Sequence, residues 1–313
     1  MSDFTGADLT GQSGRCFVVT GANAGIGFAI AHALAAQDAR VVLACRNEDR
    51  ARAAMARIVA DHPAADLDFL PLDQGDLASV RAAAALAAKE PRIDALINNA
   101  GVMVPPLSFT RDGFEMQFGV NHLGTFALTA LMLPLLEQTA TTYGEARVVV
   151  TASIAHKKGR IAFDNLDGSQ GYARMPFYQQ SKLANLLFAT ELDRRLRAAA
   201  SRVKAIACHP GVAQSELTRH IPLRRMFTPL LGMVLNTAEE GAWPALQAAC
   251  DPALSGGEYV GSRGIFEARG PSGPAFRSIA ARDPELAKRL WDVSVDMTGI
   301  DPGLSPAPGQ PPA

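Results

Sequence analysis

Cysteine is scarce in this 313-residue chain, and its four copies are scattered. Cys16, Cys45, Cys208 and Cys250 show none of the paired spacing that metal sites use. Three of them lie in or beside apolar runs of strand length. We therefore expect reduced, mostly buried thiols, no metal centre and a cytoplasmic protein.

Net charge and long apolar runs are also lacking. The formal net charge is −1 with 19% charged residues, which argues against nucleic acid or an anionic membrane as the main partner. The first four residues carry neither the basic nor the apolar region of a secretory signal. No apolar run reaches the length of a membrane span, so we expect a soluble protein with no integral membrane segment.

What is present is an alternation of strand-like and helix-like segments. Short apolar runs predict strands at residues 15–20, 40–45, 67–73, 93–97, 147–153, 202–208 and 258–260. Helical patterns follow the first run and cover 77–89, 111–137, 176–189 and 237–250. This order predicts an α/β fold, a doubly wound parallel sheet (Rossmann fold) of about seven strands with helices on both faces. We expect one domain over 1–313, with a core at about 14–265 and a mobile Pro- and Gly-rich tail at about 301–313.

A glycine-rich turn joins the first strand to the first helix. Glycines in this position let the backbone approach a pyrophosphate, whose charge meets the N-terminus of the helix. The alternative is a plain tight turn. The residues expected to contact the cofactor here are Gly21, Asn23, Ala24, Gly25, Ile26 and Gly27.

The end of the second strand indicates which dinucleotide binds. An acid there would repel a 2′-phosphate, but this chain has Arg46 followed by Asn47. A guanidinium favours a phosphate through paired charge-assisted hydrogen bonds, so we expect NADP(H) in preference to NAD(H). Alternatively, Arg46 caps the next helix together with Glu48 and Asp49.

Polar and small residues follow other strands at the same predicted edge of the sheet, where such folds bind ligands. Asp73 either accepts from an adenine amino group or caps the next helix, although Asp76 is better placed for capping. Asn99 either ties strands together or contacts the cofactor. Ser153 ends the fifth strand, where a turn-forming hydroxyl is the alternative. Further expected cofactor contacts are Gln74, Asn98, Ala100, Gly101, Pro210 and Gly211.

Tyr178 and Lys182 stand four residues apart in a predicted helix, which places them on one face about 5–6 Å apart at Cβ. An ammonium beside a phenol lowers the pKa of the phenol. Acting near pH 7 requires a shift of about 3 units, roughly 4 kcal/mol, so we expect a second positive charge nearby. The alternative is a solvated helix face.

Together these motifs resemble the short-chain dehydrogenases/reductases over roughly residues 14–265. The pattern runs from Thr20-Gly-x-x-x-Gly-Ile-Gly27 through Asn98-Asn-Ala-Gly101, Asn121, Ser153 and Tyr178-x-x-x-Lys182 to Pro210-Gly211. The stretch 149–217 is most similar to the retinol dehydrogenase-like and protochlorophyllide reductase-like subgroup. Two departures are Ser215, where many members have Thr, and the lack of an N-terminal anchor helix.

The resemblance implies an NADP(H)-dependent oxidoreductase that interconverts a carbonyl and an alcohol. Tyr178 would be the general acid or base, and Ser153 would orient the substrate oxygen. Lys182 would bind the nicotinamide ribose and Asn121 would hold a water. Tyr178 and Ser215 would also contact the cofactor. Alternatives are reduction of a carbon–carbon double bond and a catalytically silent NADP(H)-binding protein. The family also implies a homo-oligomer, either a dimer or a tetramer.

An apolar segment at 221–235 containing Arg224 and Arg225 implies a mobile lid at about 212–236, and therefore a lipophilic small-molecule substrate. The alternatives are an oligomer or core surface, or a membrane-surface contact. His156 is expected to be a pocket-wall or hydrogen-bonding residue. The expected pocket lining is Met103, Val104, Pro105, Ile154, Phe177 and the segment after Gly211.

Overall fold

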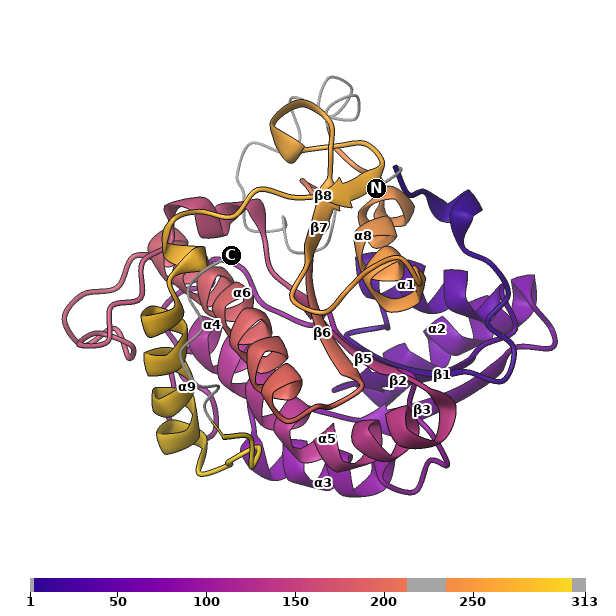
Figure 1. Ribbon diagram of the computed structural model, residues 1–313, viewed down its shortest axis with the longest axis horizontal. Helices are drawn as coiled ribbons and strands as arrows, with labels where there is room; N and C mark the ends of the chain where they lie inside the picture. The colour runs from indigo at the N-terminus through magenta and orange to yellow at the C-terminus, as the bar shows by residue number, and fades with distance from the viewer. Residues whose placement is uncertain (1–2, 213–234, 306–313) are drawn as a thin grey trace.

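The computed structural model describes residues 3–212 and 235–305 (Figure 1). All but the ends of the predicted lid lie outside the described residues, as do Ser215, Arg224, Arg225 and the end of the tail from residue 306.

One mixed sheet forms the centre of the protein and confirms the predicted fold class. Its order is β3-β2-β1-β4-β5-β6-β7-β8, and all neighbours are parallel except β7 and β8. The eighth strand was not predicted, because three residues that include a glycine and a proline give no strand pattern. The strands are Cys16–Thr20 (β1), Arg40–Cys45 (β2), Asp66–Pro71 (β3), Ala95–Asn98 (β4), Ala146–Thr151 (β5), Val203–His209 (β6), Tyr259–Ser262 (β7) and Ser272–Pro274 (β8).

Helices cover both faces of the sheet, as Figure 1 shows. One face packs against Gly25–Ala35 (α1), Glu48–Asp61 (α2) and Ala238–Cys250 (α8). The other packs against Leu77–Ala87 (α3), Gly124–Tyr143 (α5) and Arg174–Ala198 (α6), and Pro284–Thr298 (α9) packs on the outside of α6. Because the strand order reverses between β1 and β4, the ends of these two strands form the crevice where such sheets bind ligands.

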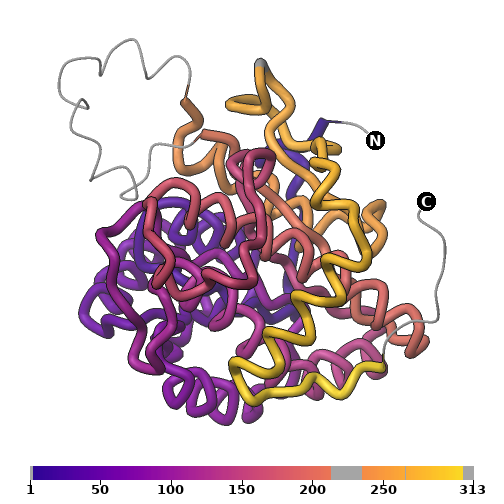
Figure 2. Tube along the Cα trace, turned by 90° about the vertical axis from the view of Figure 1, so that its left-hand side faces the viewer, coloured from indigo at the N-terminus to yellow at the C-terminus, as the bar shows by residue number. Residues whose placement is uncertain are grey.

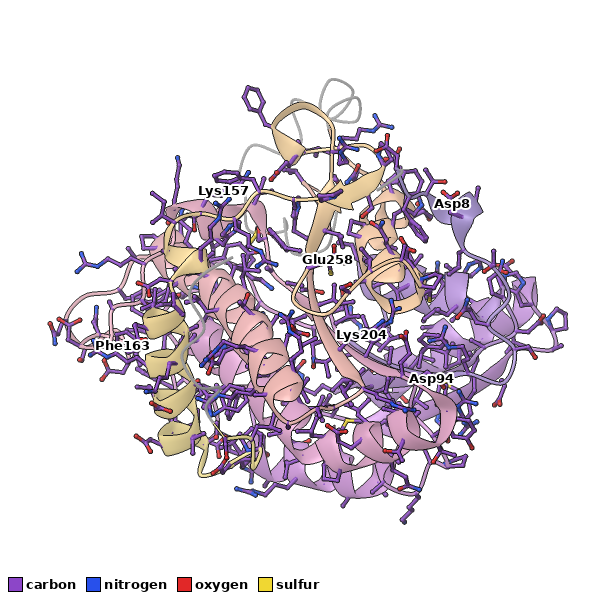
Figure 3. All side chains as sticks on the ribbon, viewed as in Figure 1. Asp8, Asp94, Lys157, Phe163, Lys204 and Glu258 are labelled. Atoms are coloured by element: carbon purple, nitrogen blue, oxygen red, sulfur yellow. The ribbon has the colours of Figure 1, made fainter. Side chains whose placement is uncertain are left out.

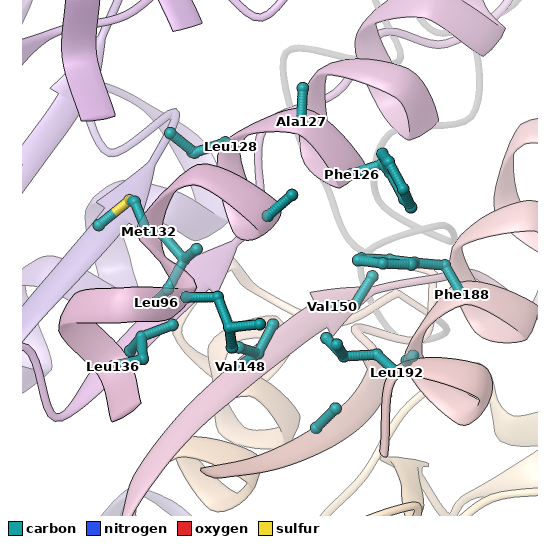
Figure 4. Close-up of a cluster of buried hydrophobic side chains, with 14 of the residues drawn as sticks. Leu96, Phe126, Ala127, Leu128, Met132, Leu136, Val148, Val150, Phe188 and Leu192 are labelled. Atoms are coloured by element: carbon teal, nitrogen blue, oxygen red, sulfur yellow. The ribbon is translucent and has the colours of Figure 1, made fainter. Parts of the chain in front are cut away.

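The second face buries a continuous apolar cluster, part of which Figure 4 shows. Val148 and Val150 of β5 point toward Phe126 and Met132 of α5, and Phe188 of α6 closes the cluster from the side. The rings of Phe126 and Phe188 lie 5.3 Å apart between centroids. Burial of each such side chain stabilises the fold by about 1.5–3 kcal/mol. This cluster therefore fixes α5 and α6, which carry polar side chains at the edge of the sheet.

The segment predicted as one helix from residue 111 begins instead at Met116. Residues 111–115 form a turn, which a β-bridge between Phe109 and Glu115 closes. A short helix, Met116–Phe118 (α4), then passes through a π-helical turn, Gly119–Leu123 (η2), into α5. The continuous helix 116–143 is long and apolar enough to cross a membrane, contrary to our expectation that no segment would be. Its apolar window is 78% buried, as in the central helix of a packed core.

The C-terminal helix α9 was not predicted. Asp283 caps it, Pro284 opens its first turn, and Gly299 ends it in the left-handed conformation. Its buried stripe mixes Trp291 with polar residues, which obscures the apolar periodicity. Trp291 packs edge-to-face on Phe126, and Figure 2 shows α9 (yellow) along the outside of the molecule. The core thus extends beyond the residues that the family pattern covers.

Candidate active site

The turn between β1 and α1 has the geometry of a phosphate-binding loop. Gly21 and Gly25 adopt φ of +68° and +55°, which side chains rarely tolerate. A Cβ on Gly27 would lie 2.3 Å from the carbonyl oxygen of Gly21, so only glycine fits there. Ala24 occupies the N-cap of α1 and supplies no side-chain cap. The first amides of α1 are therefore left for an anionic group.

At the end of β2, Arg46 turns toward β3 and does not cap α2. Its side chain is 78% exposed, and its Nη1 lies 3.7 Å from Oδ2 of Asp73. Asn47 caps the helix instead, because its Oδ1 accepts a hydrogen bond from the amide of Arg50. Asp76 caps α3, as its position suggested. The Arg46 guanidinium is thus accessible beside a carboxylate at the rim of the crevice.

Asn99 ties β1 to β4. Its Nδ2 donates to the carbonyl of Thr20 at 3.0 Å, and the Thr20 hydroxyl accepts from the amides of Asn99 and Ala100. Of the two roles weighed for Asn99, the structure shows the structural one.

Two expected cofactor contacts turn their side chains toward α5. Nδ2 of Asn98 donates to the Thr129 hydroxyl, and Nε2 of Gln74 donates to the Thr125 hydroxyl. Both side chains are buried, so they serve the junction between the sheet and α5.

Ser153 and Tyr178 meet at the end of β5. Ser153 begins a short 3-10 helix, Ile154–Lys158 (η3), and its Oγ accepts the amide of Ala155 at 3.2 Å. Burial raises the pKa of Tyr178, and a hydrogen bond with Ser153 opposes that rise. The phenol and the hydroxyl thus lie close enough to interact although they come from different elements. The lowering of the Tyr178 pKa by Lys182 stays a prediction.

Lys182 and Tyr178 are both buried, which excludes the solvated-face interpretation of this pair. The two side chains are only 4% and 8% exposed. Nζ of Lys182 donates to the carbonyl of Thr151 at 3.0 Å, and Nδ2 of Asn185 donates to the same oxygen at 3.1 Å. Burial lowers the pKa of Lys182 to about 8.

Asn121 lies in the π-helical turn and connects the loop after β4 to α6. Its Nδ2 donates to the carbonyl of Val102 and to the hydroxyl of Ser181, and its Oδ1 accepts the amide of Val102. A Cβ on Gly101 would lie 2.9 Å from this Oδ1 and 3.6 Å from Nζ of Lys182. Asn121 and Lys182 therefore both face Gly101, which must lack a side chain.

The chain after β6 makes a tight turn with defined contacts. Gly211 has φ of +69°, and a Cβ there would lie 2.4 Å from the carbonyl oxygen of Ala268. Nδ2 of Asn236 holds the carbonyl of Pro210 at 2.8 Å. These contacts fix the predicted Pro210-Gly211 turn.

On the expected substrate side, Val104 is a β-branched residue at φ of +49°, a conformation that such residues almost never adopt. Its amide donates to Oε1 of Gln117, whose Nε2 donates to the Tyr172 hydroxyl and to the carbonyl of Arg174. Met103, Val104, Pro105 and Ile154 are half-buried, and Phe177 is buried. A buried glutamine therefore holds the predicted pocket wall in a strained shape.

Sequence reasoning assigned no role to Thr20, Gln117, Ser181 and Asn185, although Thr20 stands in the family pattern. Ser181 and Asn185 were visible as polar residues beside Lys182 in an otherwise apolar stretch of α6. Gln117 gave no comparable signal, since its role depends on segments far away in the sequence.

Comparison with known sequences identifies relatives across most of the chain. A family model described as short chain dehydrogenase matches residues 15–225. Human retinol dehydrogenase 11 is 41% identical over 288 residues, which cover 92% of this chain and 86% of the relative. Human dehydrogenase/reductase SDR family member 13 is 41% identical over 309 residues, covering 96% of this chain and 77% of the relative.

Solved structures show the same architecture. A crystal structure of an uncharacterized protein from Mycobacterium paratuberculosis is 39% identical, with a TM-score of 0.80, and covers 97% of this chain and 100% of its own. The Pseudomonas aeruginosa RhlG/NADP active-site complex is 26% identical, with a TM-score of 0.66 over 82% of this chain and 98% of its own.

Proposed function

Because this chain belongs to the short-chain dehydrogenase family, we propose that it is an NADP(H)-dependent oxidoreductase that interconverts a carbonyl and an alcohol on a lipophilic small molecule. The observation that carries the proposal is that Ser153 lies next to Tyr178 and opposes the rise that burial causes in its pKa, while the buried Lys182 has its Nζ 5.9 Å from the centre of the Tyr178 ring. Ser153 follows β5 and the other two residues belong to α6, so packing alone brings Ser153 to them.

The residues around the crevice fit a nicotinamide dinucleotide. The pyrophosphate would lie on the uncapped amides of α1, where Gly21 and Gly27 keep the backbone accessible. Arg46 would bind the 2′-phosphate, since its guanidinium is exposed and only loosely paired with Asp73. A phosphate at that point would compete with Asp73 for the guanidinium. The bound cofactor supplies the hydride and, when oxidised, a positive charge.

Tyr178 would exchange a proton with the substrate oxygen, and the Ser153 hydroxyl would hold that oxygen in place. Since burial keeps Tyr178 protonated, the phenol is ready to donate when a carbonyl is reduced. Lys182 has a pKa of about 8, so it can release or take up a proton near neutral pH. Oδ1 of Asn121 uses one of its two acceptor positions on Val102 and can receive a water with the other. Such a water would connect Lys182 to solvent.

A lipophilic substrate is supported by the apolar side chains that follow β4 and β5 and open α6. Val104 and Ile154 are half-buried, and Phe177 stacks near Tyr172 with ring centroids 4.8 Å apart. Several relatives are named for retinol, an apolar alcohol. The preference would come from burial of hydrocarbon at about 25 cal/mol per Å².

The test is turnover of an α,β-unsaturated aldehyde with NADPH, with the products identified. Wild-type protein should yield the unsaturated alcohol, whereas a saturated aldehyde would indicate the double-bond reductase alternative. Tyr178→Phe should abolish turnover and leave NADPH affinity unchanged. Tyr143→Phe is the matched control, because Tyr143 is a half-exposed residue at the end of α5. Equal activity of the two variants, or NADPH binding without turnover of any carbonyl, would refute the proposal.

A further inference from the structure

His156 is a fully buried histidine directly behind Ser153. Both residues belong to one short turn, in which the amide of His156 donates to the carbonyl of Ser153 at 3.0 Å. The imidazole ring contacts the same carbonyl, with Nδ1 2.7 Å from the oxygen. The amide and the ring of His156 therefore both contact the carbonyl of Ser153, whose hydroxyl lies near Tyr178.

The contacts determine which ring nitrogen carries the proton. A carbonyl oxygen only accepts, so Nδ1 must be protonated. Nε2 then has a lone pair, and it lies 3.4 Å from the amide nitrogen of Ser278, which can only donate. Burial lowers the pKa of His156, which agrees with a neutral ring. Both nitrogens are occupied by main-chain groups, so neither is available to exchange a proton with a substrate.

The other contacts of His156 come from the C-terminal part of the chain. The Tyr259 ring of β7 packs edge-to-face on it with centroids 5.5 Å apart, and its hydroxyl lies 3.4 Å from Nδ1. Ser278 lies in the segment between β8 and α9. Figure 3 shows Lys157, the next residue along, beside this segment, and Nζ of Lys157 lies 5.4 Å from the ring centre of Phe276. His156 thus joins the Ser153 turn to elements that fold over it from the C-terminus.

We propose that His156 is a positioning residue for Ser153: its Nδ1–H fixes the Ser153 carbonyl, so that the Ser153 hydroxyl stays aimed at the reacting oxygen beside Tyr178. This inference rests on the proposed function, in which Ser153 orients the substrate. Without the Nδ1 donor the turn keeps its main-chain hydrogen bonds and the weak cap from the Ala155 amide to Ser153 Oγ, and the hydroxyl can move relative to Tyr178. Displacement of an orienting group by about 1 Å costs on the order of 100-fold in rate.

Two amide substitutions separate positioning from simple filling of space. The amide of an asparagine reaches the place of Nδ1, whereas the amide of a glutamine reaches the place of Nε2. His156→Asn should therefore keep kcat within about 5-fold of wild type, and His156→Gln should lose on the order of 100-fold. NADPH affinity should be unchanged in both. Equal kcat in the two variants would overturn the proposal.

A double-mutant cycle provides the second test. If His156 acts through Ser153, then His156→Gln should reduce kcat much less in a Ser153→Ala background than in wild type. Losses that simply multiply would show that His156 acts independently and would overturn the proposal. If Ser153→Ala itself retains full turnover, Ser153 does not orient the substrate oxygen and that part of the proposed function is wrong. Amide hydrogen exchange over residues 153–158 then still decides the role of His156. Exchange should be faster in the glutamine variant than in the asparagine variant, and equal rates would contradict the positioning role.

Discussion

The ammonium nitrogen of Lys182 lies 5.9 Å from the centre of the Tyr178 ring, and both side chains are buried. Burial disfavours the charged form of each, because it raises the pKa of Tyr178 and lowers that of Lys182 to about 8. The protein by itself thus holds a protonated phenol above a lysine that titrates near neutral pH. In the proposed mechanism, the charge of the oxidised cofactor is what would favour the phenolate.

Lys182→Met should make the cofactor-free protein more stable at pH 7 while it abolishes turnover. The cost of burying the charge is at most about 3 kcal/mol for a pKa lowered from 10.5 to about 8. Between pH 8 and 10.5 the unfolded chain holds a proton on Lys182 that the folded chain has lost, so wild-type stability rises with pH there. Asn185 still satisfies the carbonyl of Thr151.

Urea unfolding from pH 7 to 10.5 measures this effect. The advantage of Lys182→Met should shrink across the upper part of that range. The exposed Lys89→Met serves as the control and should show no such trend. A variant that is less stable than wild type at pH 7 would contradict the prediction.

Arg46→Ala should weaken NADPH binding by about 10- to 100-fold, the value of one or two charge-assisted hydrogen bonds, and change NADH binding little. The control is Arg52→Ala, since Arg52 pairs with Glu48 on the exposed side of α2. Fluorescence titration with both cofactors decides the outcome. Equal losses of affinity for NADPH and NADH would show that Arg46 does not bind the 2′-phosphate.

His122→Phe should make the protein less sensitive to acid. His122 is buried among Phe118, Phe126 and Phe188, and burial lowers its pKa to about 3. As pH falls from 6.5 toward 3, the unfolded chain takes up a proton that the folded chain cannot, so stability falls by about 1.4 kcal/mol per pH unit.

The free energy of unfolding, measured at pH 7 and pH 4.5, gives the slope of stability against pH. The phenylalanine variant should have a shallower slope than wild type, and Ser294 still donates to the carbonyl of Leu290. The partly exposed His32 is the control position for the same substitution. An unchanged slope in His122→Phe would show that other groups control acid unfolding.

Gln117→Leu should affect carbonyl substrates far more than the cofactor. It leaves the partly buried amide of Val104 without its partner, a cost of up to about 1–3 kcal/mol. The strained loop after β4 should then relax. A series of aldehydes graded by chain length should show raised KM and weaker preference for long chains, with NADPH affinity retained. Gln170→Leu, in an exposed turn, is the control. Unaltered KM values would show that the loop does not line the pocket.

Several features could be predicted from the sequence because they depend on neighbours within a few residues. The spacing of four between Tyr178 and Lys182 places them together on any helix, and the glycine turn after the first strand can be formed by few other residues. Apolar runs of strand length identified seven of the eight strands, and Asp76 was recognised as a cap.

Tertiary structure decided everything that depends on which segments cover one another. It turned Asn98 and Gln74 toward α5, began the long helix at Met116, and added β8 and α9. It also brought Ser153 to Tyr178 and set His156 behind it. Periodicity along a chain reports which face of an element is apolar, but a side chain's partners and pKa follow from what packs over that face. For that reason the sequence located the phenol and the amine, whereas only the fold showed that both are buried.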